Sequence, residues 1–211
     1  MARAFKHIGG AYVAQLEEDE ARLVITLARD VLHLLETRSG EGSSETPRDA
    51  AQDDDSATSW WEELGLSDPE AAPGVESLEP PEDPALARLL PPVSEQDPED
   101  EARLRAMLEP QVVASKRAAL QEAIELLRHH PLRVPEADAH RFGAALNDIR
   151  LVLSQRLGIE DEADSERVAR LAEARPSKNR DVDDVEHFMA MLYSFVSWLQ
   201  ESLMTALLKR R

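Results

Sequence analysis

Residues 181–209 read DVDDVEHFMAMLYSFVSWLQESLMTALLK, and this stretch decides the fold. Its apolar residues return in alternating steps of four and three, which is the repeat of an α-helix with a buried side. A second apolar stripe runs beside the first, so the combined apolar face is too wide for a simple surface helix. The first stripe is Val185, Met189, Leu192, Val196, Leu199 and Leu203, and the second is Phe188, Met191, Phe195 and Trp198.

Two interpretations of this C-terminal helix follow from its wide apolar face. In the first, it is a central helix that a bundle covers on two sides. In the second, it also contributes to a surface that binds a partner or a second copy of the chain, which would give a homodimer through the C-terminal helix.

Helical repeats also occur upstream of this stretch. Asp97 suits the N-cap of one of these helices and Pro98 its first position, whereas Pro110 is expected to kink or break it. The predicted helices cover residues of about 17–37, 98–129, 135–157 and 165–174.

The N-terminus has the pattern of a β-hairpin instead. Residues 5–8 and 12–16 flank Gly9-Gly10, a pair that permits the positive φ angles of a two-residue hairpin turn. We therefore predict an all-α fold, in which a bundle of four or five helices carries a small N-terminal β-hairpin.

The charge of the chain is concentrated in one region. The 211 residues carry a formal net charge of −18, and residues 39–101 hold 19 acids, two bases and nine of the 13 prolines. Such a composition buries too little apolar surface to offset the entropy lost on ordering. We expect a single domain, residues 1–211, with a long acidic, low-complexity and partly disordered insertion at residues 39–82.

Two apolar islands interrupt the acidic stretch. Residues 83–91, DPALARLLP, predict one turn of helix that docks through its leucines. The other island, residues 59–66, contains Trp60, Trp61 and Leu64. These three residues either dock on the protein's own core or form a docking peptide for a partner protein.

Composition excludes several classes of function. An acidic chain is a poor partner for phosphate backbones, so we expect no direct binding to nucleic acid. The chain has no cysteine, which rules out a thiolate metal site and a thiol switch. No secretion signal and no membrane-spanning run is visible, so we expect a cytoplasmic protein.

No sequence motif assigns a catalytic group. The chain has no glycine-rich phosphate loop, no G-x-S-x-G and no H-E-x-x-H. Glu136 with His140 and Asp183 with His187 have the i, i+4 spacing of helical metal ligands. Each pair lies in a predicted first turn, however, where acids favour the helix dipole. We expect no enzyme, no metal and no cofactor.

Polar residues inside two apolar helices are the candidate site. They either form a buried hydrogen-bond clamp between helices or face a partner protein, because buried polar groups must be paired. The candidates are Asn147, Asp148, Arg150, Trp198, Gln200 and Glu201.

Four segments resemble a known family in the same order and across nearly the whole chain. They are FKHIGGAY at residues 5–12, DPALARLLP at 83–91, FGAALNDIRLVLSQRLGIEDE at 142–162 and YSFVSWLQESL at 193–203. The family resembled is an actinobacterial domain of unknown function, now named AosR for an oxidative-stress transcriptional regulator.

The resemblance implies a non-enzymatic regulator that contacts a sigma factor or RNA polymerase rather than DNA. Because the family is often encoded beside the Clp adaptor ClpS, the alternative is an interaction module or adaptor in protein quality control. Redox-sensing members would need a cysteine pair, which this chain lacks. Oxidation would then be sensed by another protein or by methionines.

Overall fold

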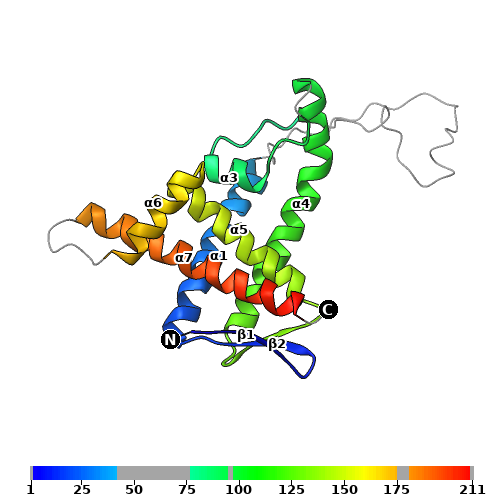
Figure 1. Ribbon diagram of the computed structural model, residues 1–211. Helices are drawn as coiled ribbons and strands as arrows, with labels where there is room; N and C mark the ends of the chain where they lie inside the picture. The colour runs from blue at the N-terminus through cyan, green and yellow to red at the C-terminus, as the bar shows by residue number, and fades with distance from the viewer. Residues whose placement is uncertain (1, 42–76, 95–96, 175–180, 210–211) are drawn as a thin grey trace, which may run out of the picture.

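The structure is a computed structural model that describes residues 2–41, 77–94, 97–174 and 181–209. Six helices and one three-stranded sheet lie in these ranges (Figure 1). The helices are α1 (Glu18–Glu41), α3 (Pro84–Leu89), α4 (Pro98–Leu127), α5 (Ala139–Arg156), α6 (Glu162–Glu173) and α7 (Asp181–Leu208). The strands are β1 (Arg3–Ile8), β2 (Ala11–Gln15) and β3 (Leu132–Pro135).

The helices form one bundle with the small sheet at its end. α4 packs against α1 and α5, α5 packs against α7, and α6 packs against α7. Figure 1 shows α7 crossing α1 and α5, while the strands lie below them. The predicted fold, a helical bundle with an N-terminal hairpin, is confirmed.

The last helix occupies the place that its wide apolar face predicts. Leu192, Val196, Leu199 and Leu203 of the first stripe are all buried. Val185, at the beginning of this stripe, is 59% exposed. The first stripe therefore belongs to the core along the C-terminal part of α7, where α5 and β1 pack against it.

The sheet confirms the hairpin and adds a strand that the sequence analysis missed. Gly9 and Gly10 have φ angles of 57° and 76°, as a two-residue turn between twisted strands requires. β3 pairs antiparallel with β2, and Tyr12 lies opposite Val134. No element was predicted for residues 132–134, and a helix was predicted to begin at about Pro135. That start is wrong, because residues 132–135 pair with β2 and α5 begins at Ala139.

Two helices also continue past their predicted limits. α1 was expected to end at about Thr37 but reaches Glu41, and buried contacts of Arg38 hold its last turns against α4. α4 continues through Pro110, so the expected break does not occur. Proline removes one backbone hydrogen bond, but Glu109 and Val113 on either side are buried and keep both halves in place.

The short helix α3 confirms the expectation for residues 83–91. Asp83 caps it by accepting hydrogen bonds from the backbone N–H groups of Ala85 and Leu86. Its leucines are buried in the core between α5 and the neighbouring loops, as their spacing predicts. Asp97 caps α4 in the same way, with the backbone N–H of Glu99 as donor at 2.8 Å.

Candidate functional site

The second apolar stripe of α7 is largely on the surface. Phe188 is 44% exposed and Met191 is 40% exposed, whereas Phe195 and Trp198 are half-buried. The rings of Phe195 and Trp198 stack with centroids 6.0 Å apart and an interplanar angle of 22°. We call Phe188, Met191, Phe195 and Trp198 the α7 stripe. Its spacing of three, four and three residues aligns these side chains along one side of the helix.

Polar contacts between α5 and α7 lie close to this stripe. The Gln200 side-chain amide donates to the backbone carbonyl of Gly143 at 3.4 Å and to Asn147 Oδ1 at 3.5 Å. Arg150 donates to the same Asn147 oxygen at 3.2 Å. Gly143 is buried beside Met204 and Leu203, so its lack of a side chain lets α7 approach α5 closely. Gln200 therefore connects α7 to α5, and Arg150 of α5 donates to the same Asn147 oxygen.

Asp148 points to a different neighbour. Its side chain is buried, and Oδ1 accepts a hydrogen bond from Lys116 Nζ on α4 at 2.6 Å. Burial raises the pKa of Asp148 above its ordinary value, although the hydrogen bond and the charge of Lys116 act in the opposite direction. This pair joins α5 to α4 and is separate from the contacts with α7.

The structure thus divides the predicted site residues into groups. Asn147, Arg150 and Gln200 come together, Trp198 stacks on Phe195, and Glu201 is exposed. Clamp and partner surface stay alternative interpretations for this set. The predicted docking peptide, Trp60, Trp61 and Leu64, lies outside the described residues, as does most of the acidic insertion.

A buried ion cluster on α1 and α4 was not predicted. Arg105 donates to Glu101 at 2.7 Å and to Glu109 at 2.8 Å, and Arg38 of α1 donates to Glu109 at 2.6 Å. All four residues are at most 8% exposed. The spacing of Glu101, Arg105 and Glu109 by four residues is a signal that the sequence carries, because such residues share one side of a helix.

The same cluster holds the chain where it leads into α4. Arg105 donates to the backbone carbonyl of Leu90 at 3.2 Å, and Arg38 donates to that of Glu79. Glu101 accepts from the backbone N–H of Ser94 at 2.6 Å. This hydrogen bond is the main contribution that keeps the pKa of Glu101 below its ordinary value. The cluster therefore fixes both α1 and residues 79–94 to α4.

Each pair with metal-ligand spacing in the sequence contains a residue that has another partner in the structure. No three His, Asp or Glu side chains among the described residues converge on a point that could hold a metal. Glu136 forms a hydrogen bond with the His7 ring, and the His187 ring donates a hydrogen bond to the Leu171 carbonyl at 2.7 Å. A pocket of about 440 Å³ between α3 and the start of α4 is lined by four prolines and by Glu101 and Arg105 of the ion cluster, among other residues. None of the described helices has an apolar run long enough to cross a membrane.

Fold and surface together define a small helical-bundle domain with a half-exposed aromatic stripe on its last helix. Residues 2–207 match the model of a family described as a domain of unknown function, DUF2017, and the chain belongs to this family. No solved structure matches the chain.

Curated relatives match part of the chain. An AosR protein of Mycobacterium leprae is 37% identical over 98 residues, which are 39% of this chain and 45% of that protein. Proteins of Mycobacterium tuberculosis and Mycobacterium bovis, each named oxidative stress regulator AosR, are 34% identical over 94 residues. Those residues are 37% of this chain and 43% of each relative. The matches thus span less than half the length of these relatives.

Proposed function

We propose that this protein is a non-enzymatic, cytoplasmic regulator of the oxidative stress response that acts by contacting a sigma factor or RNA polymerase. The names of the similar mycobacterial proteins support the regulatory part of this proposal. The α7 stripe supports the part that concerns protein contact.

The exposure of the α7 stripe is the observation that carries the proposal. Aromatic and methionine side chains are enriched at protein interfaces, and a helix with such a stripe docks readily into an apolar groove. Phe188 and Met191 expose 44% and 40% of their surface one turn apart. Phe195 and Trp198 continue the stripe, and their rings are already ordered by stacking. Little side-chain entropy is therefore lost when a partner binds.

The arrangement of positive charge supports a protein partner over nucleic acid. Six exposed arginines each form an ion pair with a neighbouring acid, which reduces the positive charge that these residues offer to a phosphate backbone. They are Arg22, Arg128, Arg141, Arg156, Arg167 and Arg170.

The chain has no cysteine, so it cannot sense oxidation through a thiol of its own. A partner would then supply the redox-sensitive group. A second route is oxidation of Met191, whose sulfoxide would place a polar group in the middle of the α7 stripe.

Binding to purified transcription components tests the proposal. The full chain is titrated against RNA polymerase core enzyme and individual sigma factors of its host, under reducing and oxidising conditions. We expect at least one component to bind. Phe188→Ser combined with Met191→Ser should weaken that binding at least about tenfold, since apolar anchors dominate such interfaces.

Ile8→Ser is the matched control, because Ile8 is an apolar residue of β1 that is 53% exposed. It should bind like the unchanged protein. The proposal is wrong if no transcription component binds under either condition. It is also wrong if the α7 variant binds as tightly as the control.

A further inference from the structure

A pocket between α3 and the start of α4 reaches from the surface to the ion cluster. We call it the α3–α4 pocket. Its volume of about 440 Å³ lies within the range of about 300–1,000 Å³ of pockets that bind small molecules. No described side chain fills it. Glu101 and Arg105 of the ion cluster line it, and its apolar walls are Pro80, Pro81, Ala87, Leu90, Pro92 and Pro98.

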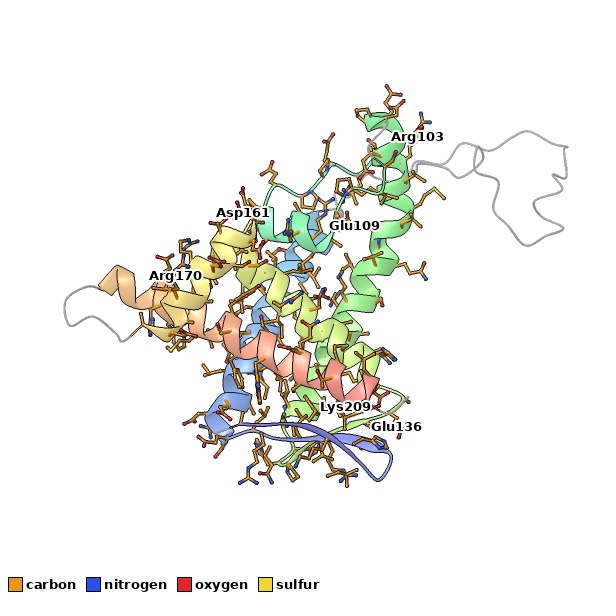
Figure 2. The ribbon with its side chains drawn as sticks, in the orientation of Figure 1. Arg103, Glu109, Glu136, Asp161, Arg170 and Lys209 are labelled. Atoms are coloured by element: carbon orange, nitrogen blue, oxygen red, sulfur yellow. The ribbon has the colours of Figure 1, made fainter. Side chains whose placement is uncertain are left out.

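Arg105 brings one unused hydrogen-bond donor to this pocket. Its Nη1 donates to the Leu90 carbonyl at 3.2 Å and to Glu109 at 2.8 Å, and its Nη2 donates to Glu101 at 2.7 Å. Figure 2 shows Glu109 on the side of α4 that faces α3. The Nε of Arg105 is buried without a hydrogen-bond partner. Such an N–H has lost its contact with water and gained nothing in return, so an acceptor placed there is favourable.

The shape of the guanidinium places the unused donor beside Glu101. The Nε–H and one Nη2–H of a planar guanidinium point in the same direction, and a carboxylate commonly accepts both. Here Glu101 accepts only from Nη2, because its other oxygen accepts from the backbone N–H groups of Val93 at 2.9 Å and Ser94 at 2.6 Å. The free Nε–H therefore points to the side of Arg105 on which Glu101 lies, and both of these residues line the α3–α4 pocket.

The apolar walls indicate the body of a ligand that fits the α3–α4 pocket. Four prolines present rigid, flat rings, and Ala87 and Leu90 of α3 add apolar surface between them. An aromatic ring buries a large apolar area in a flat, compact shape. The volume lies at the lower end of the range for ligand pockets, which suits a compound of one or two rings.

The charges around the pocket indicate that the ligand is neutral. The ion cluster is balanced, because its two arginines face two glutamates. Asp97 and Glu101, the two acids that line the pocket, would repel a carboxylate or a phosphate. A carbonyl oxygen accepts a hydrogen bond without bringing a charge into this site.

We propose that the α3–α4 pocket binds a small, neutral, aromatic carbonyl compound. The ring of the ligand packs against the prolines, and its carbonyl oxygen accepts the hydrogen bond that Arg105 Nε has to offer. Aromatic ketones, lactams and quinones share this chemistry. The inference does not rest on the proposed function.

Titration of the full chain with acetophenone tests the proposal. Acetophenone is a neutral aromatic ketone, and ethylbenzene is its matched control without the carbonyl oxygen. Nuclear magnetic resonance follows the Nε–H signal of Arg105 and the backbone amide signals of Ala87 and Leu90. Acetophenone should shift all three signals saturably. Ethylbenzene should bind about two- to tenfold more weakly, because it lacks one hydrogen bond. Benzoate should also bind more weakly than acetophenone, because it is charged.

A variant that fills the pocket gives the second readout. Ala87→Phe places a larger side chain in the α3–α4 pocket and should abolish the saturable shifts, while circular dichroism shows the helices intact. Ala114→Phe, at an exposed position of α4 outside the pocket, should bind acetophenone like the unchanged protein.

The unchanged protein alone can overturn the inference. It is overturned if millimolar acetophenone leaves the Nε–H signal of Arg105 where it is, or if ethylbenzene or benzoate binds as tightly as acetophenone. It is equally overturned if folded Ala87→Phe binds acetophenone like Ala114→Phe.

Discussion

Arg105 is the most deeply buried charged residue of the described chain, with 2% of its surface exposed. Its guanidinium donates hydrogen bonds to two carboxylates and one backbone carbonyl, which offset much of the loss of water, while its Nε is buried without a hydrogen-bond partner. An arginine taken alone is expected on the solvated surface. Only the spacing of Glu101, Arg105 and Glu109 pointed to a shared helix side, and the contact with Arg38 required the fold.

Removal of this cation should destabilise the protein strongly. Arg105→Met leaves the buried carboxylates of Glu101 and Glu109 without their shared partner, and breaking a buried ion pair costs about 3–5 kcal/mol. We expect this loss in the free energy of unfolding from urea titration. Arg103→Met, on the exposed side of the same helix, should change the value by no more than about 0.5 kcal/mol. Equal effects of the two substitutions would contradict the role assigned to the cluster.

The raised pKa of Asp148 predicts that the free energy of unfolding depends on pH. Burial raises the pKa of this carboxyl in the folded state, so the folded protein holds the proton more tightly than the unfolded chain does. Ionised Asp148 therefore lowers stability at pH values above its folded pKa, and the penalty disappears as the pH falls towards the ordinary value.

The stability of Asp148→Asn relative to the unchanged protein should accordingly increase as the pH rises through this window. Urea unfolding at a series of pH values from acid to neutral measures the difference, with Glu201→Gln as the exposed reference. A difference that decreases with rising pH would show that the pairing with Lys116 outweighs burial.

Among the helices, strands and turns, the sequence predicted those that are specified by residues within or next to them. The alternating steps of α7, the Gly9-Gly10 turn and the cap at Asp97 all lie within a few residues of the structure they specify. β3 was missed because four residues carry too little pattern, and their conformation depends on β2 at the other end of the chain. The end of α1 was misplaced because the buried contact of Arg38 with Glu109 holds its last turns against α4.

The hairpin turn depends on the left-handed backbone conformation of its two glycines. Gly10 has a φ of 76°, a conformation that side chains disfavour, although a Cβ would meet no neighbouring atom. Gly10→Ala should therefore cost about 1 kcal/mol through backbone strain alone. Gly10→Asn should cost less, because asparagine tolerates this region better. Thermal unfolding compares the two variants, and equal stability of all three proteins would contradict the turn geometry.

At the scale of the whole molecule, the bundle leaves two helices incompletely covered. α7 exposes the aromatic side of its second stripe, and α4 exposes an uncharged face opposite its ion cluster. The sequence predicted the first surface as one of two interpretations, because two adjacent stripes exceed what one bundle covers. The sequence did not predict the exposed face of α4. Charged residues on the buried side of this helix weaken the amphipathic pattern by which an outer side is recognised.

Site-specific photocross-linking in the host cell tests the central claim most directly. A photoreactive phenylalanine analogue replaces Phe188 in the full chain, and the same analogue at Ile8 is the control. During oxidative stress, position 188 should cross-link to a sigma factor or an RNA polymerase subunit, identified by mass spectrometry, and position 8 should not. Cross-links at position 188 that match those at position 8, or that contain no transcription component, would contradict the account.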